Sequence, residues 1–306
     1  MKTLVAFPDV PYYNWQVLVQ INNFVKFGYS DEMIYVVVKQ PGKQLSTQIK
    51  NVLDNTPVEY YVYDDDRLTK HYPSALRLHG LRKLFAEKPE FSGETFFYVD
   101  PDLIFSKAVS FTTLLSNNTW YVSDTKSYID STYIKSKGEE LFKTMCEVVN
   151  IKTIDVETND IYAGGAQYLM KNVDEKYWLK AERNAEILFR CMKDTEHIYN
   201  PEHPIQSWTA DMWSVLWNGW FFDHEVRIAS RLSFSWATDS ITNWDQHNLF
   251  HNAGAIDQSN LFKKTDYQTS PFNTDFSHVS DQFCSYKYME EVEETKINYP
   301  ELITLF

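Results

Sequence analysis

The chain has 306 residues, of which 43% are hydrophobic and 16% aromatic, and this composition excludes a disordered or fibrous protein. Its formal charge of −13 argues against general electrostatic binding of nucleic acid, although it does not exclude a local basic patch. The three cysteines, Cys146, Cys191 and Cys284, lie far apart without metal-type spacing, which indicates free thiols in a reducing compartment.

The N-terminus carries an apolar run, residues 3–7, that is too short for a signal peptide and is broken by Pro8. No stretch approaches the length that spans a bilayer. We therefore expect a cytoplasmic protein without a membrane partner.

The first third of the chain alternates apolar runs with amphipathic stretches. Strands are predicted at 3–7, 33–38 and 58–62, and helices at 17–25 and 46–53, the first closed by Gly28. This alternation predicts an α/β fold with a doubly wound, mostly parallel sheet flanked by helices. A further helix is entered through Pro73, and its basic residues could reach a diphosphate or simply face solvent: Arg77, Arg82 and Lys83.

The next apolar run, Phe96–Val99, is typical of a strand buried on both faces. Pro101 cannot continue a ladder, so the strand must end at Asp100 and project two carboxylates from its carboxyl end. Ligands of open α/β sheets collect at that edge. Asp100 and Asp102 could together hold a divalent cation that binds a diphosphate, whereas the bland alternative is an ordinary Asp-Pro-Asp turn.

The second half of the chain is less regular. Strands are predicted at 120–123 and 233–237, and helices around 139–149 and 174–194. Gly164 and Gly165 interrupt an apolar run, so the backbone there either approaches something closely or makes a tight turn. The acidic run at 290–294 is typical of a solvated face or a loose terminus.

Two isolated polar residues are candidates for chemistry. Asp211 is predicted in the first turn of a helix capped by Ser207 or Thr209, where the helix dipole alone could explain a carboxylate. His251 follows an apolar pair and precedes a glycine, which suits a strand end that aims an imidazole into a cleft. A lone histidine is more often structural.

We detect no internal repeat or linker, so a single domain over 1–306 is the simplest organisation. We divide it into a first part at 1–105, a second part at 106–280, and a C-terminal tail at 281–306.

Six short motifs occur in a characteristic order between Leu4 and Phe272. They are Tyr12 with Trp15 and Gln16, Tyr72-Pro73-Ser74, Phe97-Tyr98-Val99-Asp100-Pro101-Asp102, Gly164-Gly165-Ala166-Gln167, Ala210-Asp211-Met212-Trp213, and His251-Asn252-Ala253-Gly254. Together they resemble GT-A glycosyltransferases related to hydroxyproline O-arabinosyltransferases and peptidyl serine galactosyltransferases, especially the short soluble relatives of phages and large viruses. The order of the motifs is stronger evidence than any one of them.

The resemblance implies a single GT-A domain with a Rossmann-like sheet and a metal-dependent, retaining glycosyl transfer. Residues 1–105 would then be the nucleotide-binding half and residues 106–280 the donor-sugar and acceptor half. Asp100, Asp102 and His251 would bind Mn²⁺ or Mg²⁺. The donor would be a UDP-sugar such as UDP-arabinose, UDP-galactose or UDP-glucose. Its nucleotide would contact Phe7, Tyr12, Trp15, Gln16, Asp65 and Arg77, and its sugar would contact Gly164, Gly165 and Gln167. Asp211 would be the catalytic residue, orienting the sugar in a retaining enzyme or acting as general base in an inverting one.

The resemblance also bears on the acceptor. A cytoplasmic enzyme of viral type, working in the host cell, suggests hydroxymethylated pyrimidines in phage DNA, with the base flipped or locally exposed. Basic residues could contact phosphates or be ordinary surface charges: Arg227, Arg231, Lys263 and Lys264. Protein, glycan and small-molecule acceptors stay open. So do a non-catalytic nucleotide- or glycan-binding module and a metal-dependent hydrolase.

Overall fold

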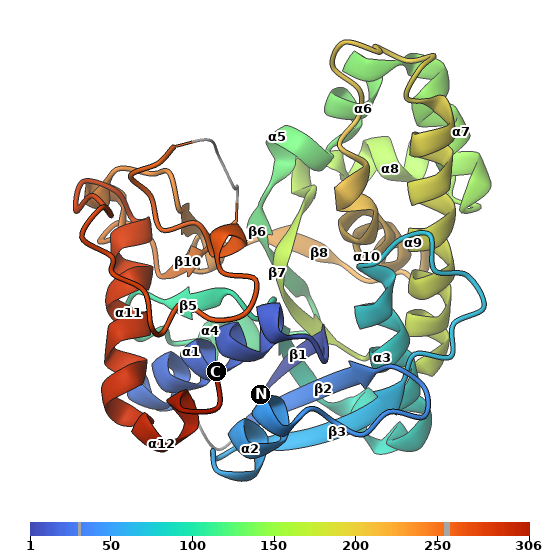
Figure 1. The fold of residues 1–306 in the computed structure, drawn as a ribbon. Helices are drawn as coiled ribbons and strands as arrows, with labels where there is room; N and C mark the ends of the chain where they lie inside the picture. The colour runs from blue at the N-terminus through green and yellow to red at the C-terminus, as the bar shows by residue number, and fades with distance from the viewer. Residues whose placement is uncertain (30–31, 254–257) are drawn as a thin grey trace. The chain divides into compact units, whose positions relative to one another are not determined.

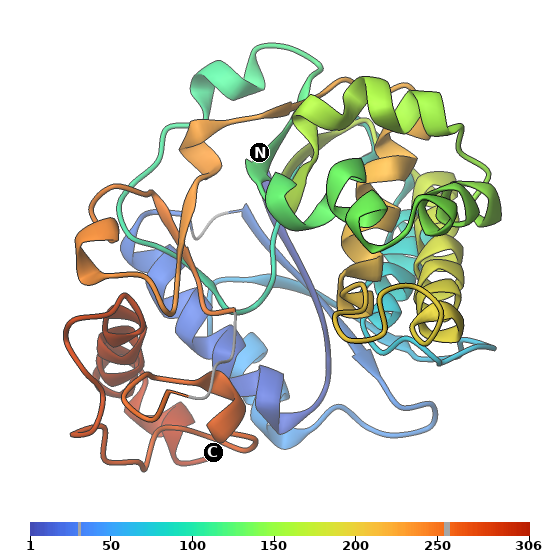
Figure 2. The ribbon, with the colours of Figure 1, turned by 90° about the horizontal axis from the view of Figure 1, so that it is seen from above.

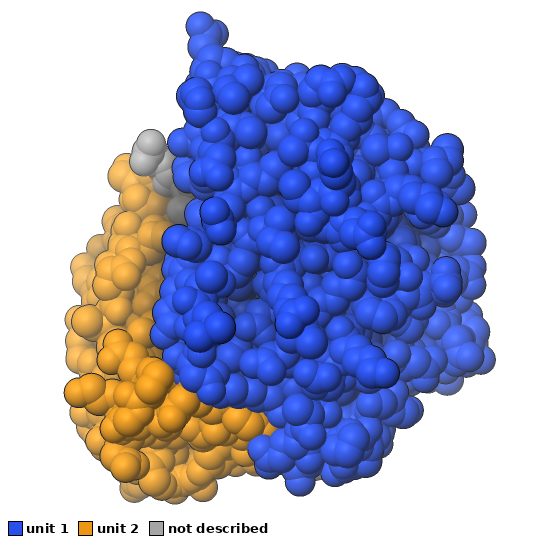
Figure 3. Space-filling model, turned by 90° about the vertical axis from the view of Figure 1, so that its right-hand side faces the viewer, with its two compact units in different colours: residues 1, 65–98, 112–230 blue, residues 2–64, 99–111, 231–306 orange. Residues whose placement is uncertain are grey.

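The computed structural model describes residues 1–29, 32–253 and 258–306 (Figure 1). The chain divides into two compact units, each discontinuous in sequence and described here by itself (Figure 3). Unit 1 comprises Met1, Asp65–Tyr98 and Thr112–Ser230. Unit 2 comprises Lys2–Asp64, Val99–Phe111 and Arg231–Phe306. The predicted division at residues 105 and 280 stays a prediction.

The N-terminal part of unit 2 alternates strands and helices, as predicted. Its elements are β1 (Lys2–Pro8), α1 (Pro11–Lys26), β2 (Met33–Lys39), α2 (Thr47–Asp54) and β3 (Glu59–Asp64). The strands lie in the order β3-β2-β1, and both pairs are parallel. β1 and β2 are almost continuously apolar and buried, which is the pattern of strands covered on both faces. Gly28 ends the first helical segment with a φ of 80°, a left-handed conformation that suits glycine.

Unit 2 also holds a small second sheet and the C-terminal helices. These elements are β5 (Leu103–Phe105), β9 (Phe234–Trp236), β10 (Leu249–His251), α11 (Ser285–Asn298) and α12 (Pro300–Ile303). The strand order is β5-β10-β9, with β10 antiparallel to β5 and parallel to β9. In this register His251 lies opposite Leu103, the residue after the Asp-Pro-Asp turn.

Helix α11 corrects the interpretation of the acidic run as a loose terminus. It lies beside α1, where the Glu291 carboxylate accepts hydrogen bonds from the side-chain amides of Asn22 (2.7 Å) and Asn23 (3.1 Å) (Figure 1). Glu291 is only 5% exposed, and its burial raises its pKa. Lys26 lies 3.3 Å from the same carboxylate. One glutamate of the run is thus an internal link between two helices, while Glu290 faces solvent.

Unit 1 contains a mixed sheet and a cluster of helices. The strands are β4 (Thr95–Tyr98), β6 (Trp120–Asp124), β7 (Gly164–Lys171) and β8 (Val226–Ile228). The helices are α3 (Ala75–Glu87), α4 (Thr112–Leu115), α5 (Lys126–Ile129), α6 (Ser131–Lys137), α7 (Glu139–Val148), α8 (Thr153–Asn159), α9 (Glu175–Thr195) and α10 (Ala210–Phe221). β7 pairs antiparallel with β4 and β6, whereas β8 is parallel to β6. The long helix α9 packs against α3 and α10 (Figures 1 and 2).

The predicted α/β fold, with a mostly parallel sheet and flanking helices, is confirmed; β7 supplies the antiparallel pairs of unit 1. Each unit buries large aromatic side chains, such as Trp15 and Tyr288 in unit 2 and Trp120 and Trp178 in unit 1. Among the described residues, no helix combines the length and the apolar character needed to cross a membrane.

Candidate functional site

The Asp100-Pro101-Asp102 turn lies in unit 2 and is held by backbone contacts. The Leu103 N–H donates to the Asp100 carbonyl (3.2 Å), which closes the turn directly before β5. The buried side-chain amide of Gln20, on α1, donates to the carbonyls of Asp100 (2.7 Å) and Leu103 (3.0 Å). Three residues further along α1, Asn23 exchanges two hydrogen bonds with the backbone of Phe105. Helix α1 therefore fixes the turn and the strand that follows it.

Three side chains predicted to bind a metal converge at this turn. One ligand atom each from Asp100, Asp102 and His251 can be chosen so that all three lie within 4.8 Å of one another. His251 Nε2 is 3.3 Å from Asp102 Oδ1 and 3.7 Å from Asp100 Oδ2. The pairing of β10 with β5 brings the histidine here, and the Asn252 N–H, which donates to the Asp102 carbonyl (3.1 Å), continues that contact.

The two carboxylates differ in their surroundings. The Asp102 side chain is 4% exposed and that of Asp100 is 26% exposed. Lys264 lies in a short 3-10 helix, Lys264–Asp266, and forms an ion pair with Asp102 Oδ2. Burial acts to raise the pKa of Asp102, but the Lys264 ammonium and His251 outweigh it and hold that pKa well below its ordinary value. Asp102 is therefore ionised at neutral pH.

The chemistry of this cluster fits a divalent cation. Carboxylate oxygens are the ligands that Mg²⁺ and Mn²⁺ prefer, and an imidazole nitrogen can complete a mixed set. Asp100 is the most exposed member, which leaves one side of the cluster open to solvent. Gly254, the last residue of the His-Asn-Ala-Gly motif, lies outside the described residues.

Most of the predicted nucleotide contacts in unit 2 are core residues. Phe7 and Trp15 are fully buried, and the Trp15 indole N–H donates to the Tyr267 carbonyl (3.0 Å). Gln16 is 1% exposed, and its amide donates to the backbone of Tyr12. Burial raises the pKa of Tyr12, and the charge of Asp102 raises it further, so Tyr12 lies within electrostatic range of the metal cluster.

Asp211 lies in unit 1, in the first turn of α10 as predicted. Thr209 occupies the position before the helix without capping it, because its hydroxyl donates to the Gln206 carbonyl (2.7 Å). Both Asp211 carboxylate oxygens have partners. Oδ2 forms an ion pair with Arg77, and Oδ1 lies 2.6 Å from the Tyr72 hydroxyl. Arg77, which was predicted to contact the nucleotide, is thus paired with the predicted catalytic residue.

The Tyr72 hydroxyl links Asp211 to the preceding loop. It lies 2.6 Å from the Trp208 carbonyl as well and accepts a longer contact from the Asp211 N–H (3.3 Å). Its ring stacks on Phe189 with centroids 4.8 Å apart. Burial, followed by the Asp211 charge, raises the pKa of Tyr72 well above its ordinary value, so the hydroxyl stays protonated and can donate. The Asp211 carboxylate is therefore held in a fixed orientation by Arg77 and Tyr72.

Asp65, another predicted nucleotide contact, belongs to a buried network in unit 1. Its carboxylate accepts from Arg67 through Nε (2.8 Å) and a terminal nitrogen (3.2 Å), a bidentate arrangement. Arg67 also lies 3.4 Å from Glu186, whose other oxygen accepts from the Tyr72 N–H (3.2 Å). The network supports the loop that carries Tyr72.

Gly164 and Gly165 lie at the start of β7, where neighbouring atoms approach the backbone closely. This agrees with the interpretation of the motif as a close approach of the backbone rather than a tight turn. A Cβ on Gly164 would lie 2.4 Å from the Ser123 carbonyl oxygen of β6, and one on Gly165 would lie 2.4 Å from the Tyr168 hydroxyl. The β6–β7 register shifts here, and Gln167 accepts a hydrogen bond from the Ser123 hydroxyl (2.6 Å). The close neighbours of this motif are thus parts of unit 1 itself.

The basic residues proposed as phosphate contacts all have partners within their own units. Arg227 pairs with Glu225 and lies over the Tyr162 ring, 3.8 Å from its centroid. Arg231 donates to the Ser110 carbonyl (3.3 Å). The remaining two pair with acidic groups: Lys263 with Asp266, and Lys264 with Asp102.

Sequence reasoning missed the roles of three residues that shape these sites: it gave Gln20 none, named Lys264 only as a possible phosphate contact, and named Tyr72 only as part of a motif. Gln20 and Lys264 contact the metal cluster, and Tyr72 orients Asp211. Gln20 carried a usable signal, because a polar side chain inside the apolar run 17–21 needs a buried partner. Lys264 carried none, since it lies 162 positions from its partner in a loop.

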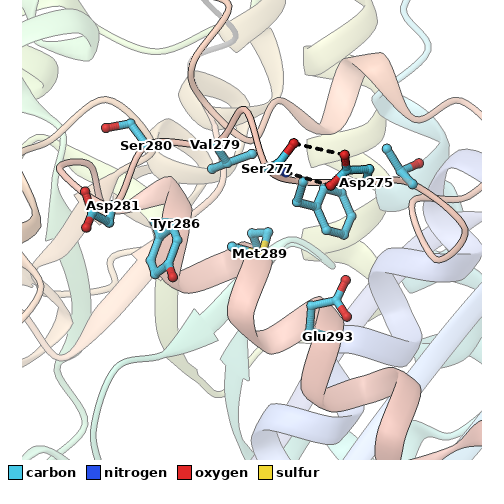
Figure 4. A pocket seen from close by; sticks show the side chains of 10 residues that line it. Asp275, Ser277, Val279, Ser280, Asp281, Tyr286, Met289 and Glu293 are labelled. Atoms are coloured by element: carbon cyan, nitrogen blue, oxygen red, sulfur yellow. Dashed lines mark hydrogen bonds between the residues drawn. The ribbon is translucent and has the colours of Figure 1, made fainter.

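Unit 2 also contains a separate acidic pocket of about 550 Å³ (Figure 4). Its lining includes Asp275, Asp281 and Glu293, and the described residues that line it include no Lys, Arg or His. Asp275 is engaged by the backbone and hydroxyl of Ser277, each at 2.9 Å. The negative charge of this pocket is unfavourable for binding a diphosphate.

Comparisons with known proteins give fold-level likeness. No family model matches the chain, and no curated protein matches it. Among solved structures it is similar to the apo form of the bifunctional glycosyltransferase WbbM, with 10% identity and a TM-score of 0.48 over 100% of this chain. The match covers 51% of WbbM, so the chain spans about half the length of that protein.

Two further structures cover nearly all of this chain. The galactosyltransferase LgtC, solved with donor and acceptor sugar analogs, matches over 96% of both chains with 14% identity and a TM-score of 0.46. The glycosyltransferase GlyE of Streptococcus pneumoniae TIGR4 matches over 97% of this chain and 62% of its own length, with 11% identity and a TM-score of 0.46.

Proposed function

We propose that this chain is a metal-dependent GT-A glycosyltransferase that moves a sugar from a nucleotide-sugar, preferably a UDP-sugar, to an acceptor hydroxyl. The observation that carries the proposal is the convergence of Asp100, Asp102 and His251 at the turn directly before β5. A structural Asp-Pro-Asp turn would need neither the second carboxylate nor an imidazole from a strand almost 150 residues later.

Asp100, Asp102 and His251 would hold Mn²⁺ or Mg²⁺. A cation bound there supplies charge stabilisation to a diphosphate leaving group. Gln20 holds the backbone of the acidic turn, so the two carboxylates are positioned before any ligand arrives. Such preorganisation means that little reorganisation is needed when charge develops.

We assign Asp211 an orienting role in a retaining reaction. Arg77 and Tyr72 engage its two oxygens, so both oxygens already have partners within unit 1. A general base needs a free lone pair within reach of the acceptor proton. The same contacts suit a carboxylate that holds the donor sugar or the acceptor by a fixed geometry.

The acceptor class is to be determined by a screen. Hydroxymethylated pyrimidine DNA stays a prediction, and the partners of the four basic residues weaken its electrostatic support. Peptides, glycans and small hydroxylated molecules should be screened with it.

The decisive experiment is a thermal-shift panel of UDP-, GDP-, ADP- and CDP-sugars, each with Mn²⁺ and with a chelator. We expect one nucleotide family to raise the melting temperature, and the shift should vanish with the chelator. Asp100→Ala should abolish that shift, whereas Asp275→Ala, in the separate acidic pocket, should retain it. No metal-dependent shift with any donor would refute the proposal. Donor hydrolysis with and without acceptors then separates transfer from simple hydrolysis.

A further inference from the structure

The Asp102 carboxylate poses an electrostatic problem that Lys264 solves. Asp102 is 3% exposed, and a buried carboxylate is strongly unfavourable without a counter-charge. Lys264 supplies this charge at Oδ2, while His251 Nε2 lies at Oδ1. The metal cluster therefore contains its own cation.

A bound divalent cation would compete with that ammonium. A metal held by Asp100, Asp102 and His251 would be coordinated at about 2.0–2.6 Å by carboxylate oxygens, so both cations would share the Asp102 carboxylate at close range. Like charges at such a distance repel strongly in a site that is mostly screened from water. Either cation alone, the Lys264 ammonium or the metal, is enough to offset the charge of Asp102.

Lys264 is built so that its side chain can leave while its backbone stays. The side chain is 20% exposed and its four-carbon stem is flexible, so a path to solvent exists. The turn that carries it is anchored, because the Tyr267 N–H donates to the Lys264 carbonyl (3.1 Å) and the Tyr267 carbonyl accepts from the buried Trp15 indole (3.0 Å). The next lysine, Lys263, pairs with Asp266 within the same turn.

We propose that Lys264 is an exchangeable cation: it occupies Asp102 in the metal-free protein and is released toward solvent when a divalent cation binds. This inference rests on the metal site of the proposed function. The exchange keeps Asp102 paired at every stage and so preserves the shape of the empty site. It also weakens metal binding, because the metal must displace an existing ion pair.

The first test measures the reactivity of Lys264 in the unmodified chain. The protein is labelled with an amine-acylating reagent, with and without Mn²⁺ and without nucleotide, and each lysine is quantified by mass spectrometry. We expect acylation of Lys264 to rise several-fold with Mn²⁺ and to fall again with a chelator. Lys263 and the exposed Lys50 are internal controls and should not change.

The second test is calorimetric titration of Mn²⁺ alone. Lys264→Met should bind Mn²⁺ at least tenfold more tightly than the parent, and Lys263→Met should bind as the parent does. Mn²⁺ binding with unchanged Lys264 acylation would overturn the exchange and leave the metal site standing. Absence of Mn²⁺ binding in the parent would overturn both. Because the labelling uses the unmodified chain, a Lys264→Met protein that fails to fold does not remove the test.

Discussion

Replacing Asp102 should lower the stability of the protein more than replacing Asp100, although both residues are assigned to the metal site. Asp102→Ala takes the carboxylate away from Lys264 and His251 inside a buried site, and removing one partner of a buried pair costs about 3–5 kcal/mol. Lys264 can turn to solvent, so we expect the loss to be smaller, about 2–3 kcal/mol. For a chain of this size that corresponds to a melting temperature lower by about 3–5 °C. Asp100→Ala, at a 26% exposed side chain, should cost about 0–1 kcal/mol.

The assay is thermal unfolding of the parent, both single variants and Asp102→Ala/Lys264→Met, each in chelator and then with Mn²⁺ and the stabilising donor. In chelator only the Asp102→Ala protein should melt early, and adding Lys264→Met should recover part of the loss, because no uncompensated ammonium remains. With Mn²⁺ and donor, none of the three variants should gain the stabilisation seen in the parent. Equal melting temperatures for both single variants in chelator would refute the reasoning about burial, and retained donor stabilisation in either would remove that residue from the metal site.

Three further outcomes follow from unit 1. Gly164→Ala should lower stability by about 1–3 kcal/mol, because its Cβ would meet a backbone carbonyl at 2.4 Å, while Gly93→Ala, with nothing within 4 Å, should change little; urea midpoints compare them. Tyr72→Phe should lower the transfer rate constant about tenfold without changing donor KM, as it frees one oxygen of the proposed orienting carboxylate; equal kinetics would contradict this. For Asp65, burial raises the pKa but its arginine partner lowers it further, from 3.8 to about 2, so its contribution to stability is present above about pH 4 and lost as pH falls toward 2; the urea-midpoint gap to Asp65→Asn should shrink from pH 6 to pH 2.5.

The regular parts of the fold were predictable because they depend on local apolar patterns. Residues 33–38 were predicted as a strand and lie in β2, and 174–194 were predicted as a helix and lie almost wholly in α9. The direction of β7 was not predictable. An apolar run has the same composition whether it pairs parallel or antiparallel, and the long connections before β7 permit either.

The candidate sites divide along the same line. Pro101 ends the apolar run by its own chemistry, and a histidine at the end of an apolar run is visible locally, so the three metal-site candidates could be chosen from short stretches of sequence. The counter-ions of Asp102 and Asp211 could not be predicted in this way. Lys264 meets Asp102 across 162 positions and Arg77 meets Asp211 across 134, and no periodicity specifies pairs at such separations.

The sequence of helix α1 nevertheless contains amide side chains that point to these long-range contacts. Its side chains Gln20, Asn22 and Asn23 are each 3% exposed or less, although amides lose hydrogen bonds to water when buried. Buried amides must find partners, so three of them within four positions of an apolar helix require polar groups on whatever packs there. Those groups are the backbone of the acidic turn and of β5 and the carboxylate of Glu291. The amides thus indicated that polar groups pack against α1, while the identity of those groups depended on the tertiary fold.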